Sequence, residues 1–514
     1  MSKTIIIIGA GLAGLSAALQ AAENGCNVKL VSSFPSERAQ SVMAEGGINA
    51  ALNTKDENDS PEEHFTDTIK AACGLADPNA VWGMTQAAPE LVHWLLKLGV
   101  QFNMSGYDDV DLRNFGGQKK KRTAFAQSDT GKQIMTAMID AVRRKEASGM
   151  VERFSHHSFL TLRLCDNICC GCVIRDEYSQ ETVELPGDAV IVATGGMHGL
   201  FGNTTGSLSN TGEVTAELFR LGVPLANGEM IQYHPTTVKC GGKRMLISEA
   251  ARGEGGRLFA MKDGKQWYFM EEKYPELGNL MPRDITAREI WKVSHESEVF
   301  LDMTEISDEI ISNKLSGLAD DCMTYLHKDI RKEPVSVLPG IHYFMGGILV
   351  DEQHRTPIQN FYAAGECCAQ YHGANRLGGN SLLGALYGGR VAAKSACEQA
   401  DVVDLSCATQ IDFPPASQIS EIKQLNKVMQ ETMGVVRNEN TLLNGIQTVQ
   451  ALTGNLPLLG MAVLKSALAR KESRGAHWRE DYPKSNDDDY LKTTVARFDG
   501  KQIQISFVPV PERR

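Results

Sequence analysis

The chain has 514 residues, enough for two or three domains and a large hydrophobic core. Hydrophobic residues make up 42% and charged residues 22%, proportions typical of an ordinary globular protein. The formal net charge of -11 argues against nucleic acid or an anionic membrane surface as the main partner. It does not argue against a small anionic substrate, because the charge inside one site is independent of the total.

The twelve cysteines lack the paired spacing of a disulfide framework. Without a recognisable secretory signal, they are expected to be reduced thiols of a cytoplasmic chain. Cys165, Cys169, Cys170 and Cys172 form one group that could bind a soft metal or an iron–sulfur cluster. The apolar run at 168–174 favours a strand instead, so no metal site is predicted. No run of eighteen uninterrupted apolar residues predicts a membrane helix either.

The N-terminal sequence predicts a strand–helix–strand unit that binds a dinucleotide. A strand is expected at residues 4–8, followed by Gly9, Gly11 and Gly14 in the spacing G-x-G-x-x-G and by a helix. The first glycine makes a tight turn, the second lets the backbone approach a pyrophosphate, and the third allows close packing of helix and strand. Ser32 occupies the position where a carboxylate would bind the ribose of NAD, which argues against a plain NAD site.

Residues 231–256, IQYHPTTVKCGGKRMLISEAARGEGG, combine groups suited to proton and anion chemistry. If residues 246–252 form a helix, Glu249 and Arg252 lie one turn apart on one face. A carboxylate beside a guanidinium stays ionised and can pass protons along hydrogen bonds. His234 precedes a proline, so its backbone is biased towards an extended or turn conformation. On this stretch alone, a surface loop with an ordinary ion pair is the simpler interpretation.

Several stretches together resemble the flavoprotein subunit of succinate dehydrogenases and fumarate reductases. They are the G-x-G-x-x-G motif, RAQSVMAEGGINAAL at 38–52 and HGANRLGGNSLLGALYGGR at 372–390. The L-aspartate oxidases belong to the same superfamily. The similarity extends from about residue 5 to about residue 491.

This resemblance implies an α/β fold with three parts. The Rossmann-like FAD-binding domain comprises residues 1–229 and 339–400, and an α+β capping domain, residues 230–338, is inserted into it. A C-terminal helical domain, residues 415–514, ends in a hairpin around Asp499-Gly500.

By the same resemblance, the chain binds FAD. Respiratory members of the family carry a histidine that binds FAD covalently, and here that position is Gln40. An amide cannot form this bond, so FAD is expected to be noncovalent. In this family the absence of the link tends to accompany a lower flavin potential, which favours fumarate reduction over succinate oxidation. The expected FAD contacts are Gly9, Gly11, Gly14, Ser32, Gln40, Gly46, Gly47, Thr194, Gly195, Gly196, Glu366, Ser381 and Leu382.

The resemblance also implies a dicarboxylate site. The residues expected to hold the two carboxylates are His234, Ser248, His342 and Arg376. Arg283 aligns with the arginine that delivers a proton, and Glu249 and Arg252 align with the relay that resupplies it. Considered alone, Arg283 would instead be assigned to a salt bridge with Asp284 or Glu289.

Phe115 bears on the choice of substrate. Aspartate oxidases place a glutamate at the aligned position, where it receives the ammonium of the substrate, whereas fumarate reductases have a phenylalanine. We therefore expect fumarate and succinate as substrates. L-aspartate oxidase remains the alternative enzyme. A flavoprotein scaffold or tRNA-modification factor that shares only the FAD fold is the alternative from another class.

The expected partners follow from the family and the charge. They are the dicarboxylate and an iron–sulfur subunit or another redox protein, with no nucleic acid and no direct insertion into a membrane. The expected location is the cytoplasm, or the inner face of the membrane through partner subunits.

Overall fold

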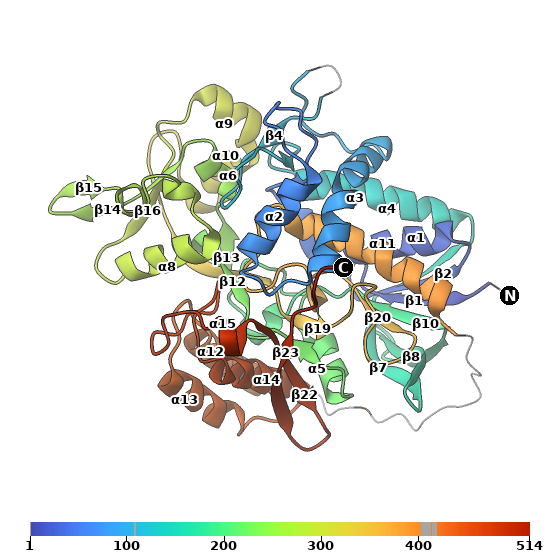
Figure 1. Cartoon of the computed structure of the whole chain (residues 1–514). Coiled ribbons are helices and arrows are strands. Elements are labelled where there is room, and N and C mark those ends of the chain that lie inside the picture. The colour runs from blue at the N-terminus through green and yellow to red at the C-terminus, as the bar shows by residue number, and fades with distance from the viewer. Residues whose placement is uncertain (1, 107–108, 402–412, 414–418) are drawn as a thin grey trace.

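The computed structural model describes residues 2–106, 109–401, 413 and 419–514. Its centre is a parallel five-stranded sheet in the order β20-β10-β1-β2-β6 (Figure 1). Every residue from Ile5 to Ile8 is buried, as expected for a parallel strand that is covered on both faces. The α/β fold expected from the sequence is confirmed. The strands are β1 (Thr4–Ile8), β2 (Asn27–Ser32), β6 (Val151–Ser155), β10 (Ala189–Val192) and β20 (Phe361–Ala363).

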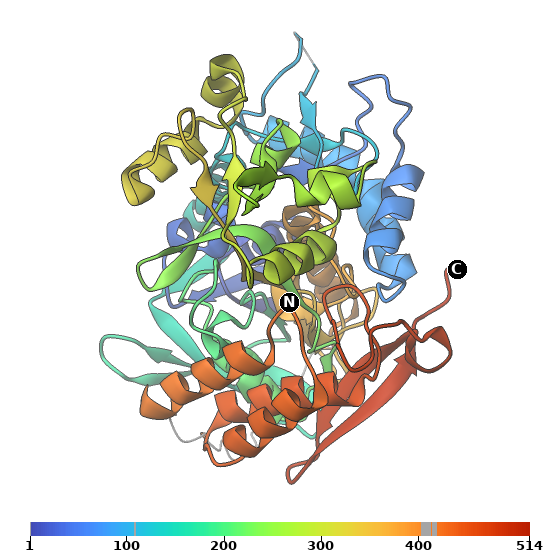
Figure 2. The same cartoon turned by 90° about the vertical axis from the view of Figure 1, so that its left-hand side faces the viewer.

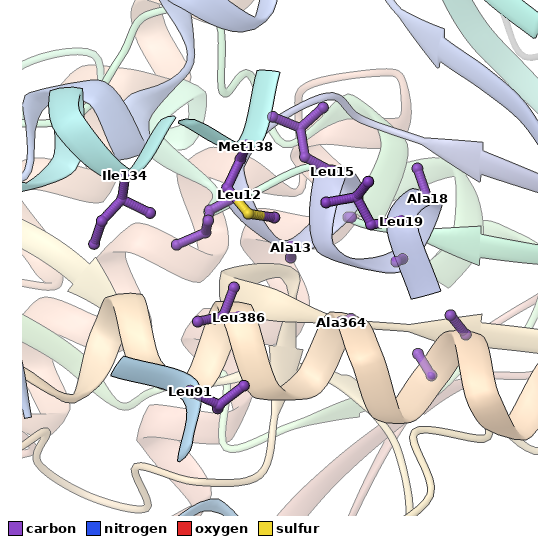
Figure 3. Packing of buried hydrophobic residues seen from close by; sticks show 14 of the residues in the cluster. Leu12, Ala13, Leu15, Ala18, Leu19, Leu91, Ile134, Met138, Ala364 and Leu386 are labelled. Carbon is purple, nitrogen blue, oxygen red and sulfur yellow. The ribbon is translucent and has the colours of Figure 1, made fainter. Parts of the chain in front are cut away.

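Helices cover one face of this sheet and a smaller sheet covers the other. Ile5 and Ile7 belong to a hydrophobic cluster with helices α1 (Leu12–Glu23), α3 (Pro78–Lys97), α4 (Thr130–Ala147) and α11 (Asn380–Gln399) (Figure 3). Ile6 and Ile8 belong to a second cluster, because successive side chains of a strand point to opposite faces. That cluster includes residues of the antiparallel sheet β7 (His157–Cys165), β8 (Ile168–Asp176) and β9 (Thr182–Pro186). Helix α2 (Pro61–Ala71) packs on α3.

The cysteine group lies in this second sheet. Cys169, Cys170 and Cys172 are buried free thiols in β8, so the predicted strand is confirmed. The described part of the chain contains no group of three or more His, Cys, Asp or Glu residues placed to hold a metal ion. Cys165 lies at the end of β7.

A second group of elements, which we call the cap, lies at the upper left of Figure 1. It has its own hydrophobic cluster. The sheet β12 (Ile231–Cys240), β13 (Lys243–Leu246) and β18 (Leu338–Phe344) leads into it. The cap comprises α6 (Glu249–Gly253), β14 (Arg257–Lys262), β15 (Lys265–Trp267), α7 (Phe269–Lys273), α8 (Arg283–Val293), β16 (Val299–Asp302), α9 (Asp308–Lys314), α10 (Ser316–Asp321) and β17 (Val335–Ser336).

The C-terminal elements lie on the opposite side from the cap, at the bottom of Figure 2. They are the helices α12 (Ile419–Thr432), α13 (Glu439–Val449), α14 (Asn455–Ala469) and α15 (Asp487–Tyr490), and the hairpin of β22 (Lys492–Phe498) and β23 (Ile503–Pro509). The hairpin extends a sheet of β11 (Leu225–Ala226), β19 (Gly347–Leu349) and β21 (Cys368–Ala369). Within the described ranges, no helix is both long enough and apolar enough to cross a bilayer.

Candidate active site

A cavity of about 310 Å³ lies between the β1–α1 turn, the cap and the N-terminus of α11. All but two of the site residues expected from the sequence line it. Gly14 and Arg252 do not. The lining residues expected from the sequence are Gly9, Gly11, Ser32, Gln40, Gly46, Gly47, Phe115, Thr194, Gly195, Gly196, His234, Ser248, Glu249, Arg283, His342, Glu366, Arg376, Ser381 and Leu382.

The β1–α1 turn is built for close backbone approach. Gly9 has a φ of 110°, and a Cβ there would lie 2.3 Å from the carbonyl oxygen of Ala193. A Cβ on Gly14 would lie 1.8 Å from the carbonyl oxygen of Gly9, so neither position accepts a side chain. Gly11 precedes the first residue of α1, where free N–H groups attract a pyrophosphate.

Other polar groups of the wall fit the remainder of FAD. Ser32 Oγ and Asn210 Nδ2 are buried and line the cavity, and neither has a hydrogen-bond partner among the described residues. Glu366 accepts a hydrogen bond from the Phe344 N–H at 3.0 Å. Burial raises its pKa to about 7. Buried polar groups of this kind normally find a partner, and a ribityl or ribose hydroxyl of FAD would supply one.

Gln40 is fixed by the loop that follows Gly196. Its Oε1 accepts a hydrogen bond from the backbone N–H of Ser207, and its side chain lines the cavity. The position of the amide is therefore held at the wall, beside Gly46 and Gly47 of the same segment.

Arg283 and Glu249 form the centre of the cap side of the cavity. Arg283 Nε and Nη2 donate to Glu249 Oε2 at 2.8 and 2.6 Å, and Nη1 donates to Gln232 Oε1 at 3.0 Å. The alternative salt bridges of Arg283 are wrong, since Glu289 pairs with Lys273 and Lys292 instead. Arg283 starts α8, so its side chain turns back towards the cavity, while Glu289 lies further along the helix.

Glu249 also accepts the N–H of Gly116 at 3.1 Å and lies 3.3 Å from Arg252 Nη2. Burial raises the pKa of Glu249, but attraction to Arg283 and Arg252 outweighs it and leaves the pKa below its ordinary value. The helix expected over 246–252 is shorter than predicted. Leu246 ends β13, and Ser248 is the N-cap, whose hydroxyl accepts the Ala250 N–H at 3.4 Å.

His234 and His342 face each other with ring centroids 5.2 Å apart. Burial, followed for His342 by repulsion from His234 and nearby arginines, lowers both pKa values well below 6.5, so the rings are neutral at neutral pH. The hydroxyl of Thr205 lies 2.8 Å from His342 Nδ1, and the Thr236 N–H donates to His234 Nδ1 at 3.3 Å. His234 Nδ1 also lies 3.1 Å from the carbonyl oxygen of Thr236, so the tautomer decides whether this nitrogen donates or accepts.

Arg376 is buried, and its Nε has no hydrogen-bond partner among the described residues. Its guanidinium stacks on Tyr343, with Cζ 4.4 Å from the ring centroid. Burial and repulsion from Arg283 lower the pKa of Arg376 to about 9, so it remains a cation at neutral pH. A buried cation beside a cavity with a free donor is suited to an anion.

Phe115 closes the cavity between two glycines. Its ring is 2% exposed, and a Cβ on Gly46 or Gly378 would lie 2.8 or 2.9 Å from ring carbons. The carboxylates that line the cavity are Glu45, Glu213, Glu249 and Glu366. Glu249 is paired with two arginines, and burial raises the pKa of the other three.

Three residues of the site were missed from the sequence. Gln232 accepts a hydrogen bond from Arg283 and donates one to the carbonyl oxygen of Arg376 at 2.8 Å. Its side chain therefore links the two arginines. Thr205 fixes His342, and Glu45 lines the cavity with its pKa raised by burial to about 8. For two of them the sequence held a signal, a polar side chain within an otherwise apolar or glycine-rich stretch. Gln232 lies two residues before His234, and Glu45 lies one residue before Gly46.

Two family models match the chain. A family model described as an FAD binding domain matches residues 4–382, and one described as the C-terminal part of fumarate reductase flavoproteins matches residues 452–513.

Similar relatives span almost the whole chain. The succinate dehydrogenase flavoprotein subunit of Bacillus subtilis is 38% identical over 100% of this chain and 98% of its own length. The 8-methylmenaquinol:fumarate reductase flavoprotein subunit of Wolinella succinogenes is 32% identical over 100% and 92%. The L-aspartate oxidase of Pyrococcus furiosus is 32% identical over 94% and 97%. A solved mutant of E. coli quinol fumarate reductase FrdA has a TM-score of 0.90 and 27% identity, covering 99% of this chain and 97% of that chain.

Proposed function

The chain belongs to the flavoprotein family of succinate dehydrogenases and fumarate reductases, which bind FAD, and from this premise we propose that it interconverts fumarate and succinate, mainly as a fumarate reductase. One observation carries the proposal. Two buried arginines, Arg283 and Arg376, line the same cavity, and the wall of that cavity at Phe115 is apolar.

In this proposal, the residues divide the work between binding and proton transfer. His234, His342, Ser248 and Arg376 hold and polarise the two carboxylates through donors that are already in place. When bound, FAD supplies the hydride for one alkene carbon. Arg283 donates a proton to the other carbon. A free guanidinium is a poor acid, and Glu249 is ionised and has no proton of its own to give. Glu249 would therefore take up a proton from Arg252 and pass it to Arg283 through hydrogen bonds of 2.6 and 2.8 Å.

Arg252 completes the proton path. Its Nη2 lies 3.3 Å from the Glu249 oxygen that Arg283 does not use, and its Nη1 donates to the Asn279 carbonyl oxygen at 2.6 Å. The order from the interior is therefore Arg252, Glu249, Arg283 and then substrate.

L-aspartate oxidase is the alternative enzyme. Whether the cavity can hold the ammonium of aspartate distinguishes it from a fumarate reductase. Phe115 offers this ammonium only a ring, and a cation–π contact contributes about 1–2 kcal/mol. Loss of hydration costs a charged amine several kcal/mol, so the balance is unfavourable. Two of the lining carboxylates do not change this balance, since Glu249 is paired with Arg283 and the pKa of Glu45 is raised to about 8.

The test compares two anaerobic reactions of the same FAD-loaded protein. Fumarate should reoxidise the reduced protein, whereas L-aspartate should not bleach the oxidised flavin. Phe115→Tyr is the matched control and should keep fumarate turnover, while Phe115→Glu should weaken fumarate by adding a negative charge. Rapid bleaching by aspartate without reoxidation by fumarate would assign the protein to the aspartate oxidases.

We also propose that the FAD is noncovalent, because Gln40 cannot form the histidyl link. Acid precipitation should release all of the FAD into the supernatant. Flavin fluorescence that stays with the denatured polypeptide would contradict this. A midpoint potential at or above that of the fumarate/succinate couple would contradict the reductive direction.

We propose further that an iron–sulfur subunit or another redox protein exchanges electrons with the chain in the cytoplasm or at the inner face of the membrane. The relatives from B. subtilis and W. succinogenes are named as subunits, which supports this. Purification of the native protein should bring the partner with it. A tRNA-binding assay beside fumarate turnover tests the non-enzymatic alternative, and tRNA binding without turnover would favour a scaffold.

A further inference from the structure

Helix α8 touches the C-terminal elements on the side away from the cavity. The guanidinium of Arg288, on α8, stacks on the indole of Trp478, with Cζ 4.0 Å from the ring centroid. Trp478 lies between α14 and α15, and in Figure 1 the C-terminal helices lie directly below α8. The cap and the C-terminal elements therefore meet through the helix whose first residue is Arg283. We call this pair the α8 latch.

Trp478 is held on a rigid support. Its neighbours His477 and Arg479 are both fully buried, and its carbonyl oxygen accepts the Arg437 N–H at 3.0 Å. The guanidinium of Arg479 is paired with Asp481 at 2.6 Å. The indole is thus fixed relative to the C-terminal elements, and Arg288 is the side of the latch that belongs to the cap.

A second contact joins the same helix to the active site. Asn375 Nδ2 donates to Asp284 Oδ1 at 3.1 Å, and Asn375 Oδ1 accepts from Gln232 Nε2 at 2.9 Å. Gln232 Oε1 in turn accepts from Arg283 at 3.0 Å. A rotation of α8 that separates Arg288 from Trp478 would also disturb this circuit, because Asp284 and Arg283 are consecutive residues of the first turn.

Packing on other elements also positions α8. The helix lies against β12 and β18, and its Ile290 is buried in the hydrophobic cluster of the cap. A gap of about 10 Å³, too small for more than one water, lies beside the latch and is lined by Tyr233, Val435 and Trp478 among others. The stack and the hydrogen bonds add to this packing where α8 meets the C-terminal elements.

We propose that Arg288 and Trp478 are positioning residues, which hold α8 at the angle at which Arg283 reaches Glu249, Gln232 and the substrate. The part that concerns the substrate rests on the proposed function. Neither residue lines the cavity, so their effect on the reaction is transmitted through α8.

The first test uses the FAD-loaded full chain without substrate. Trp478→Ala and Arg288→Ala should each speed amide hydrogen exchange in α8 by about 2- to 30-fold, the factor that loss of a cation–π contact implies. Trp478→Phe keeps a ring face and should restore most of the protection. The matched control is Tyr268→Ala, which removes the stack of Arg257 on Tyr268 at 3.7 Å inside the cap and should leave α8 unchanged.

The second test is kinetic. Both alanine variants should keep their full FAD content and lose kcat for fumarate reduction by a similar factor, and the double variant should lose no more than either single one. Unchanged exchange in α8, or effects of the two substitutions that simply add, would overturn the proposal. If the parent shows no fumarate turnover while exchange in α8 responds as expected, the proposed function fails and the latch stands.

Discussion

The smallest unit that explains the site is the ion triad of Arg283, Glu249 and Arg252. A buried carboxylate alone would become neutral, and a buried guanidinium alone would be costly. Here Glu249 offers one oxygen to each arginine, so that each buried group has an oppositely charged partner. If these residues form the proposed proton path, the path is assembled before the substrate arrives, which lowers the reorganisation that the transition state requires.

Removing Arg283 or Glu249 from the path should stop catalysis without emptying the site. Arg283→Ala should abolish fumarate reduction and leave flavin absorbance and dicarboxylate binding largely intact, because the lost interaction is made in the transition state. Glu249→Gln should behave similarly, since it blocks the resupply of protons. The measurements are steady-state kinetics and flavin difference spectra with malonate. If Arg283→Ala keeps a rate within about tenfold of the parent, or roughly 1.4 kcal/mol, another residue is the acid.

Glu45 should make the stability of the protein fall as pH rises. Burial, with added repulsion from Asp321 and Asp129, raises its pKa from 4.5 to about 8. Between these values the folded state keeps a proton that the unfolded state has released, so the free energy of unfolding falls by up to about 1.4 kcal/mol per pH unit. Urea unfolding of the FAD-loaded protein at pH 6 and pH 8 measures this.

Glu45→Gln carries no titratable proton and should lose less stability between the two pH values. Glu366, with a pKa raised to about 7, contributes with the same sign in both proteins. The informative quantity is therefore the difference between parent and variant. Equal losses in both would show that Glu45 does not hold its proton in the folded state.

At the scale of elements, the strongest local patterns predicted the structure well. The strand and helix around the G-x-G-x-x-G motif lie as expected, because the turn requires glycine and the strand is continuously apolar. The strand at Cys169–Cys172 was also predicted from its apolar run. Residues close together in the chain determine these features, so a local sequence pattern is enough to predict them.

Features that depend on distant contacts were not predictable in this way. The start of α6 was placed too early, because the capping hydroxyl of Ser248 and the strand pairing of Leu246 with Thr237 decide it. Gln232 joins two arginines that are 51 and 144 residues away, which no local pattern records. Likewise the pKa of Glu45 depends on Asp321, which lies in the cap.

The packing of α1 on α11 gives a prediction at this scale. A Cβ on Gly389 would lie 2.3 Å from the carbonyl oxygen of Ala13 and 3.0 Å from the Cβ of Ser16, and backbone atoms cannot give way cheaply. Gly389→Ala should therefore reduce the free energy of unfolding by about 1–3 kcal/mol. Lys394→Ala, at an exposed position of the same helix, should stay within about 0.5 kcal/mol of the parent in the same denaturant titration. Equal stability of the two variants would mean that α1 and α11 can move apart to make room for the added methyl group.

At the scale of the whole molecule, a buried polar cluster joins the C-terminal elements to the FAD-binding part. Arg470 follows α14 and is fully buried together with Glu229, which precedes β12, and Glu472. Its Nε donates to Glu229 at 2.7 Å and its Nη1 to Glu472 at 2.8 Å. Its remaining N–H groups bind the carbonyl oxygens of Tyr490 and Lys492 and the hydroxyl of Thr494. One side chain thus ties three separate segments of the chain.

Arg470→Ala should destabilise the molecule as a whole. It leaves the buried carboxylate of Glu229 without a cation, whereas Glu472 keeps its pair with Arg474 at 2.8 Å. Breaking a buried ion pair in this way costs about 3–5 kcal/mol. Because Glu229 leads directly into β12, which carries His234, the loss should reach the FAD site as well as the hairpin. Denaturant unfolding followed by flavin fluorescence and by far-ultraviolet circular dichroism should shift to the same lower midpoint. Arg497→Ala, at an exposed position of β22, is the control and should shift neither signal. If Arg470→Ala lowers the midpoint of the dichroism but leaves flavin release where it was, the C-terminal elements unfold on their own and the cluster does not couple them to the site.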